Sequence, residues 1–460
     1  MRTNRIFPAA LWLLTLAAGG LAQGAPKYGD LIVSGFALNP PVSAVLLVDP
    51  ATGKTSTLRR IAGGEIDQWV GMMDDNRHIG LLTRDSLGRV GLLQQLNPRG
   101  VLTTLASIRS NVPVTDPAGA VWDPEGRLLI AADDTLFRYD PAAPGAVASL
   151  FRFPATSASP PFIQAIAVAP GPRMNFDENF YALNALPQVG SPNLTAPFLY
   201  RFDPVTRRYA TLVADPALIT ATSISYWYGT PSPAHKRLLV TRGRAGTSIR
   251  DVLTVDLGSG RLTTVAKLPM LLPAAHKVTQ QQTAWVVGPS TAAPAPSEAL
   301  EVDLASGAVK RTIPLLGPAG FQATGVEVYG TNMLQLRGRA FLEDAPLSIS
   351  LQTNDAALAG NNYLLALAFE SSPPIQLTVG TTPVDLNLAW DWLLVISLFN
   401  PALIGLSNSL GTLDGSGNAS ASLSLPSGLK TGGLTIYAAW VVYDPSTVLR
   451  VSETELFVLP

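Results

Sequence analysis

The sequence predicts an all-β protein, a six-bladed β-propeller followed by a β-sandwich. Three observations support this fold class. A hairpin motif recurs six times, charged residues make up only 14% of the chain while it contains 39 Gly and 38 Pro, and the motif stops near residue 329 while strand-like runs continue. Low charge with many turn residues is typical of short strands and tight turns rather than long solvated helices. The length of 460 residues suggests two or three domains.

The first 22 residues have the pattern of a signal peptide. Arg2 and Arg5 supply the positive end, residues 6–16 are mostly apolar, and Gly20 and Ala22 occupy positions −3 and −1 of a cut after Ala22. The alternatives are cleavage two residues later and a retained anchor, although the apolar stretch is short for a membrane span. We therefore expect a secreted protein, extracellular or periplasmic, with no transmembrane segment in the mature chain.

Charge and cysteine content exclude several classes of partner and site. Removing Arg2 and Arg5 leaves 30 basic against 33 acidic residues, a net charge of −3. This balance lacks the basic footprint that nucleic-acid-binding proteins need, so we expect no nucleic acid as partner. The chain contains no cysteine, which excludes disulfides, thiolate metal ligands and thiol nucleophiles.

The repeat is an apolar strand that ends in Asp or Asn, often followed by Pro, then a turn and a Thr-rich strand. Its copies are VLLVDP at 45–50, LQQLNP at 93–98, LFRYDP at 136–141, LYRFDP at 199–204, VLTVDL at 252–257 and ALEVDL at 299–304. The Asp or Asn side chain can accept hydrogen bonds from the backbone two residues on, and a following Gly accepts positive φ. Five copies have that Gly, and the fourth has Arg207.

An apolar strand, a polar turn and another apolar strand precede each later hairpin, which gives four strands per blade at a period suited to a propeller. The first hairpin lacks an innermost strand, whereas a single strand at 323–328 follows the last hairpin. We infer that this strand completes the first blade and closes the ring. The propeller is thus expected at residues 27–328. Seven blades are the alternative, because one repeat interval is long enough to contain another hairpin.

Residues 329–460 are predicted to form the β-sandwich. Strand-like runs occur at 347–351, 363–369, 375–377, 419–423, 434–443 and 455–458, separated by turn signals at sandwich-like spacing. Trp390 and Trp392 flank Asp391 in a segment that we predict to be an alternating strand. The Tyr226-Trp227-Tyr228 cluster is a candidate surface for carbohydrate stacking or partner binding, but we prefer to place both clusters in the core.

The run at 410–419, LGTLDGSGNA, and the later LP and LTIY at 425–426 and 434–437 resemble a C-terminal module of secreted proteins from planctomycete-type bacteria. The function of that module is unknown, and it typically follows propellers. The propeller half resembles the broad group of six-bladed NHL-type and lactonase-type propellers. The resemblance implies export and architecture, and it implies no activity.

One candidate site lies where residues enter the innermost strands and gather at a mouth of the central channel. By alignment of the repeats these residues are Asp67, Asp116, Gln164, Thr222, His276 and Gln322. The resemblance to lactonase-type propellers implies calcium or a similar cation at this mouth, and carboxylates, amides and one His can ligate it. This sequence lacks that family's Glu and Asn ligands at clear positions, so the other interpretation is a polar, water-filled mouth.

We therefore expect a non-catalytic binding or scaffold protein whose propeller presents a surface to a ligand or partner. The motif Gly-x-Ser-x-Gly of nucleophile elbows is absent. The alternative is a metal-dependent, lactonase-like hydrolase that uses Asp67, Asp116 and His276, so enzyme activity stays open. We expect no cofactor, with calcium as the open alternative, an extracellular protein or carbohydrate as ligand, and a monomer.

Overall fold

The computed structural model describes residues 25–458 with gaps. The gaps are residues 39–40, 63–65, 74, 76, 86–89, 110–116, 124–125, 154–162, 170–178, 185–198, 204–206, 228–236, 244–248, 280–282, 292–296, 331–333, 338–345, 371–372, 380–381, 387, 425–434 and 453. The predicted signal peptide, residues 1–22, lies outside the described residues. Within them, no helix has the length and apolar character needed to cross a membrane.

The described part of the first 330 residues contains six four-stranded antiparallel sheets, the blades, whose strands are named below from the innermost outward. Blade 1 contains β24 (Gln322–Val328), β1 (Leu31–Leu38), β2 (Pro41–Val48) and β3 (Thr55–Ala62). Blade 2 contains β4 (Ile66–Met72), β5 (Ile79–Arg84), β6 (Gly91–Leu96) and β7 (Leu102–Ile108). Blade 3 contains β8 (Pro117–Trp122), β9 (Leu128–Ala132), β10 (Thr135–Tyr139) and β11 (Val147–Arg152).

The other three blades follow the same order. Blade 4 contains β12 (Ile163–Ala169), β13 (Asn179–Asn184), β14 (Leu199–Asp203) and β15 (Arg208–Val213). Blade 5 contains β16 (Ala221–Trp227), β17 (Arg237–Gly243), β18 (Arg250–Asp256) and β19 (Leu262–Lys267), with the 3-10 turn η1 (Pro216–Thr220) before it. Blade 6 contains β20 (Ala275–Thr279), β21 (Thr283–Pro289), β22 (Ser297–Asp303) and β23 (Val309–Leu315).

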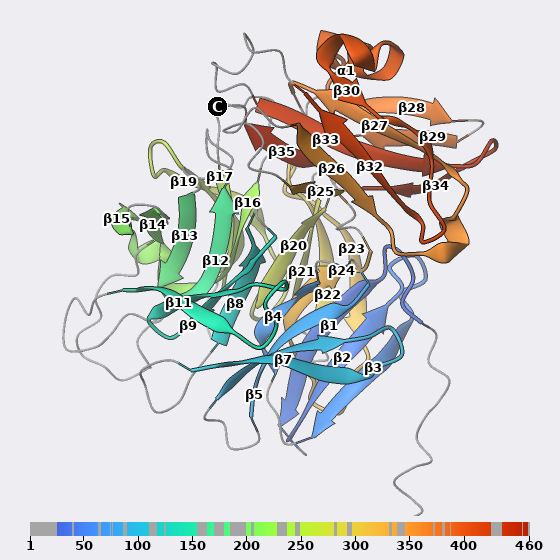
Figure 1. Cartoon of the computed structure of the whole chain (residues 1–460). Coiled ribbons are helices and arrows are strands. Elements are labelled where there is room, and N and C mark those ends of the chain that lie inside the picture. The colour runs from blue at the N-terminus through green and yellow to red at the C-terminus, as the bar shows by residue number, and fades with distance from the viewer. Residues whose placement is uncertain are drawn as a thin grey trace, which may run out of the picture.

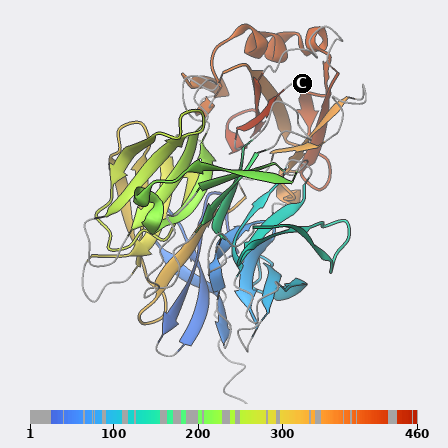
Figure 2. The ribbon, with the colours of Figure 1, turned by 90° about the vertical axis from the view of Figure 1, so that its left-hand side faces the viewer.

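The ring closes through the pairing of the last propeller strand with the first. β24 lies antiparallel to β1, with Leu31 opposite Val328 and Phe36 opposite Gln322. Apolar side chains from both faces of each blade pack against its neighbours; one cluster joins Val33 of β1 to Trp285 of β21 and Val326 of β24. Figures 1 and 2 show the six blades around a common axis below the C-terminal sheets.

The repeated hairpins have the predicted turn chemistry. Asp49 Oδ1 accepts a hydrogen bond from the backbone N–H of Ala51, at 2.8 Å, and Asn97 Oδ1 accepts from that of Arg99, at 2.9 Å. Gly53 follows with a φ of +70°. In the fourth hairpin Arg207 has a φ of +54°, so this residue adopts the left-handed conformation that glycine supplies elsewhere.

The C-terminal residues form two facing sheets. One contains β25 (Leu334–Arg337), β26 (Leu347–Gln352), β32 (Asn418–Leu423) and β30 (Leu406–Ser407). The other contains β31 (Leu410–Thr412), β27 (Asn362–Ala368), β33 (Thr435–Tyr443), β34 (Val448–Val451) and β35 (Glu455–Val458). Side chains of Ile349, Leu365 and the fully buried Trp440 pack between them. The predicted fold class, a six-bladed β-propeller followed by a β-sandwich, is confirmed.

The outer face of the second sheet carries β28 (Ile375–Val379), β29 (Thr382–Leu386) and α1 (Trp392–Phe399). The short 3-10 turns η2 (Ala356–Leu358) and η3 (Pro401–Ile404) contribute Leu358 and Ile404 to the core between the two sheets. The prediction of a strand around Asp391 was wrong, because Asp391 caps α1 and its Oδ1 accepts from Leu394 N at 2.9 Å. Burial was also wrong there: Trp390 and Trp392 are 63% and 55% exposed. Trp227, by contrast, is buried; its neighbour Tyr228 lies outside the described residues.

Side chains on both sides connect the propeller to the sandwich. The Arg450 guanidinium of β34 lies 4.8 Å from the centre of the Tyr28 ring, just before β1. Asn354 donates from Nδ2 to the backbone carbonyl of Asp75 in the β4–β5 turn. Tyr329, which follows β24, donates to the backbone carbonyl of Arg77 at 3.1 Å, and burial raises the pKa of Tyr329 to about 12. These contacts place the sandwich against the rim of blades 1 and 2.

Candidate ligand site in the propeller channel

A cavity of about 330 Å³ lies where the innermost strands of all six blades converge. Its lining comes from β4, β8, β12, β16, β20 and β24, one strand from each blade. Because side chains alternate along a strand, each innermost strand directs residues toward the blade on either side and along the channel between them. The cavity is thus a product of the ring as a whole.

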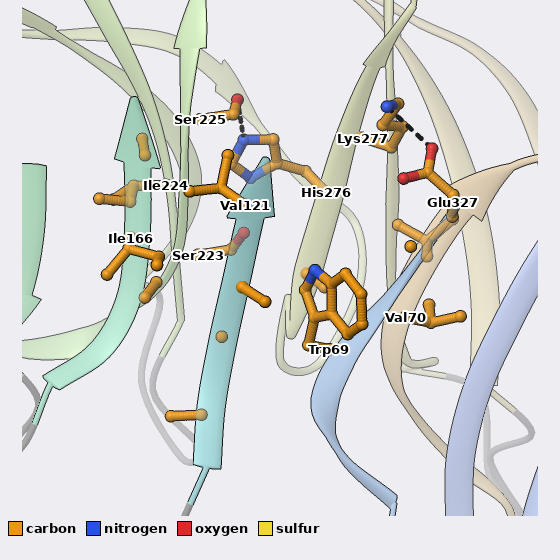
Figure 3. A pocket seen from close by; sticks show the side chains of 18 of the residues that line it. Trp69, Val70, Val121, Ile166, Ser223, Ile224, Ser225, His276, Lys277 and Glu327 are labelled. Carbon is orange, nitrogen blue, oxygen red and sulfur yellow. Dashed lines mark hydrogen bonds and ion pairs between the residues drawn. The ribbon is translucent and has the colours of Figure 1, made fainter. Parts of the chain in front are cut away.

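One side of the cavity, formed by blades 2 to 4, is named the apolar wall. It includes Trp69 and Val70 of β4, Val121 of β8 and Ile166 of β12. Gln164, at the start of β12, contributes an amide to this side. Figure 3 shows the Trp69 ring and the Val70 side chain below the level of Ser225, His276, Lys277 and Glu327.

The opposite side, formed by blades 5, 6 and 1, is named the polar wall. Its polar side chains include Ser223, Ser225, His276, Lys277 and Glu327, and the same strands also contribute the apolar Ile224 and Val326. Ser223 and Ser225 belong to β16, His276 and Lys277 to β20, and Glu327 to β24. The cavity therefore has an apolar half and a half with hydroxyl, imidazole and charged groups.

His276 is the centre of a hydrogen-bonded group at the junction of blades 5 and 6. Its Nε2 lies 2.7 Å from Ser225 Oγ, and its Nδ1 lies 2.6 Å from Thr241 Oγ1. The residue is 7% exposed, and burial lowers the pKa of the imidazole to about 3. The ring is neutral at ordinary pH, because no carboxylate among its described partners compensates a positive charge.

The neutral ring gives Ser225 two hydrogen-bonding states. When Nδ1 carries the proton and donates to Thr241, Nε2 accepts from the Ser225 hydroxyl, which then offers lone pairs to the cavity. When Nε2 carries the proton, it donates to Ser225 Oγ, and the hydroxyl proton can point into the cavity. Ser225 can thus meet a ligand either as donor or as acceptor.

Lys277 and Glu327 connect blades 6 and 1. Lys277 Nζ lies 2.8 Å from Glu327 Oε1, and the side chains are 24% and 12% exposed. Figure 3 shows this ion pair across from the Ser225–His276 pair. Each charge has its counter-charge within the protein, so the polar wall presents dipoles and a closed ion pair.

The structure distributes the predicted mouth residues unevenly. Gln164, Thr222 and His276 line the same cavity, but Gln322 is exposed and is not part of its lining. Thr222 Oγ1 donates to the carbonyl of Pro273 at 3.0 Å, so Pro273 lies beside Thr222. His276 is three residues further along the chain and therefore lies deeper in the channel than Thr222. The side chain of Asp67 and the whole of Asp116 lie outside the described residues.

The described residues contain no group of three or more His, Asp or Glu side chains arranged to hold a metal ion. His276, which the metal-dependent alternative would use, has hydroxyl partners on both ring nitrogens. A cation would have to displace Ser225 or Thr241 to reach it. The arrangement is therefore suited to hydrogen bonding of a ligand rather than to ligation through His276.

Sequence reasoning did not identify Ser225, Thr241, Lys277 or Glu327 as channel residues. The composition of the innermost strands could have indicated them. β8 and β12 contain only Ala, Gly, Val or Ile at their centres, whereas β16 and β20 contain Ser, His and Lys. Which strands face each other across the ring depends on ring closure, and this pairing is visible only in three dimensions.

No family model and no curated protein matches the chain. Solved structures are similar to it at low identity. A chain from a nidogen–laminin complex is 12% identical, with a TM-score of 0.45, and the match covers 65% of this chain and 98% of that one. TolB from Acinetobacter baumannii is 13% identical, with a TM-score of 0.44, and the match covers 67% of this chain and 69% of that one. A gluconolactonase from Xanthomonas campestris is 14% identical, with a TM-score of 0.40, and the match covers 72% of this chain and 96% of that one. At these TM-scores the likenesses carry no argument about function.

Proposed function

We propose that this chain is an exported binding protein whose propeller channel holds a small ligand, while the sandwich attaches or spaces the ring. The observation that carries the proposal is the cavity of about 330 Å³ with one apolar and one polar wall. Ligand sites in proteins are typically concave, largely apolar and furnished with a few polar groups, and their volumes are about 300–1,000 Å³.

The chemistry of the polar wall supports binding over catalysis. A general base works best with a pKa near the working pH, whereas burial lowers the pKa of His276 to about 3. Lys277 and Glu327 are paired with each other. The proposed binding needs no cofactor.

Export is part of the proposal. The Arg-led, apolar N-terminal segment with its cut after Ala22 supports it, as does the resemblance of residues 410–437 to a module of secreted bacterial proteins. The ligand would then be extracellular or periplasmic, and the rim of the ring offers a second surface for a protein or carbohydrate partner.

The test is a ligand screen on the mature chain and on a variant with a filled channel. Ser223 is half-buried and lines the cavity, so Ser223→Leu places an extra apolar side chain in it. Ser149 is exposed on the outermost strand of blade 3, so Ser149→Leu is the matched control. We expect compounds that raise the melting temperature of the wild type and the control, with at least a tenfold loss of affinity in Ser223→Leu.

Binding that Ser223→Leu leaves unchanged, in a variant with wild-type melting temperature, would place the ligand elsewhere and overturn the proposal. Calcium provides a second check. Millimolar calcium is expected to leave the melting temperature unchanged, and a calcium-dependent rise together with lactone hydrolysis would favour the metal-dependent hydrolase instead.

A further inference from the structure

We infer that the channel ligand is an uncharged, ring-containing molecule with one apolar face and one hydroxyl or carbonyl group. This inference rests on the proposed function, because it names the class of ligand for the same cavity. It follows from the apolar wall, the hydrogen-bonding state of Ser225, the closed ion pair of Lys277 and Glu327, and the size of the cavity.

The apolar wall selects for a flat or compact hydrocarbon surface. Val70 and Ile166 are buried, and the partly exposed Trp69 ring occupies the same side of the cavity. Figure 3 shows the flat indole of Trp69 standing beside the open space of the channel. Aromatic side chains bind other rings by offset stacking or edge-to-face contact, so a ring is the ligand shape that uses this surface most fully.

The polar wall offers one adaptable hydrogen-bonding group rather than a charge. Ser225 is half-buried, lines the cavity, and has His276 Nε2 as a hydrogen-bond partner at 2.7 Å. Through the two tautomers of His276 its hydroxyl can donate to a carbonyl or accept from a ligand hydroxyl. Thr241 fixes the ring from behind at 2.6 Å, so this group is already oriented before a ligand enters.

A charged ligand would lose its hydration in this cavity without gaining a counter-charge. Among the lining residues that the structure describes, the charged side chains are those of Lys277 and Glu327, which are 2.8 Å apart and neutralise each other. His276 stays neutral, because a positive imidazole would be buried without a carboxylate partner. Burial of an unpaired charge is strongly unfavourable. The channel therefore discriminates against carboxylates and ammonium compounds of the same shape.

The volume of about 330 Å³ limits the ligand to the small end of the drug-sized range. A bicyclic ring with one polar group is a suitable probe. The experiment compares 2-naphthol with naphthalene-2-carboxylate, 2-naphthylmethylammonium and glucose, using isothermal titration calorimetry or protein-observed NMR on the mature chain at neutral pH. Naphthol is neutral, whereas the carboxylate and the ammonium compound carry opposite charges. Glucose is a neutral ring with hydroxyl groups all around its edge.

We expect naphthol to bind at least tenfold more tightly than either charged analogue and than glucose. Ser225→Ala should weaken naphthol binding by about three- to tenfold, the contribution of one hydrogen bond. The variant should leave unchanged the weaker binding of naphthalene, which lacks the hydroxyl and is titrated alongside. Ser149→Ala on the outer strand is the matched control, and the expected effect is none. If Ser225→Ala does not fold, the order of affinities on the wild type decides the inference alone.

The outcomes separate the inference from the proposed function. If a charged analogue or glucose binds more tightly than naphthol and Ser223→Leu abolishes that binding, the ligand class is wrong and the channel site stands. If the screen finds ligands but Ser223→Leu affects none of them, the site itself is wrong. If naphthol binds and Ser223→Leu leaves its affinity unchanged, both proposals fail.

Discussion

The two walls of the channel differ although they are built from the same repeat. Blades 2 to 4 contribute Trp69, Val70, Val121 and Ile166, whereas blades 5, 6 and 1 contribute hydroxyls, an imidazole and an ion pair. The outer hairpins of the blades on both sides have the same turn chemistry, with Asp or Asn capping the turn. The repeat therefore fixes the frame, and variation is concentrated in the innermost strands.

The contrast between repeated outer hairpins and varied innermost strands indicates that, in a ring of equivalent blades, function is expected at the innermost strands. The outer strands need only close hairpins and pack against neighbours, so their pattern is repeated. The six innermost strands converge on one cavity, each beside the innermost strands of its neighbours, so polar groups on them find partners across a blade junction. His276 with Ser225 and Thr241, and Lys277 with Glu327, are two such solutions at adjacent junctions.

The largest expected effect comes from placing a charge on the apolar wall. Ile166→Asp buries a carboxylate among the side chains of blades 3 and 4, and we expect a loss of about 3–5 kcal/mol in the free energy of unfolding. Ser223→Asp, on the polar wall at a half-buried position, should cost about 1 kcal/mol or less. Chemical denaturation measures both, and equal losses would contradict the distinction between the walls.

The next effect concerns His276 and pH. Burial lowers the pKa of this group from 6.5 to about 3, so between these values the unfolded chain binds the proton and the folded chain does not. Stability is therefore complete above pH 6.5 and falls as the pH falls. From pH 7 to pH 5 the expected loss is about 2 kcal/mol.

The variant His276→Leu should abolish this pH dependence, although it lowers stability at pH 7 because Ser225 and Thr241 lose their partner. Urea denaturation at pH 7 and pH 5, for wild type and variant, measures the difference between the two slopes. Ser149→Ala, on the exposed outermost strand of blade 3, is the control and should keep the wild-type slope. A wild-type slope in His276→Leu would show that the imidazole takes up its proton in the folded protein as readily as in the unfolded chain.

A smaller effect is expected at the ion pair. Lys277→Met leaves Glu327, which is 12% exposed, without its cation, and we expect a loss of about 1–2 kcal/mol. Adding Glu327→Gln should recover part of that loss, since the remaining carboxylate is then also removed. Denaturation of the single and double variants forms a thermodynamic cycle, and strict additivity would mean that the pair does not couple blades 6 and 1.

The sequence predicted the frame because its signals are local. Each hairpin has its own strand, cap and turn, so six copies could be counted, and the unpaired strand near residue 323 pointed to the ring closure between β24 and β1. The segment at Trp390 was misread because a short apolar run fits both a strand and a helix, and the capping role of Asp391 decided for the helix.

The candidate site was less predictable, because it depends on how far each innermost strand extends into the channel. Aligning the repeats placed His276 at the level of Thr222, whereas the contact between Thr222 and Pro273 shows that it lies deeper. β12 and β16 each contain a bulge near their start, within their pairing with the next strand of the same blade, whereas β20 has none. Such irregularities change how far a strand reaches into the channel, and they have no clear signature in one sequence.

The smallest expected effect lies outside the channel and tests whether the outer hairpins are as equivalent as they look. Arg207 is exposed and has a φ of +54° where other hairpins have glycine. Arg207→Gly relieves a strain of about 1 kcal/mol but adds freedom to the unfolded chain, so we expect a net gain of about 0.5 kcal/mol. Gly53→Arg is the reciprocal change, at a φ of +70° with only Ile313 within 4 Å of an added Cβ, and it should lose about 1 kcal/mol. Thermal denaturation of both variants measures the pair, and a gain for Gly53→Arg would mean that the turns differ in more than their glycine.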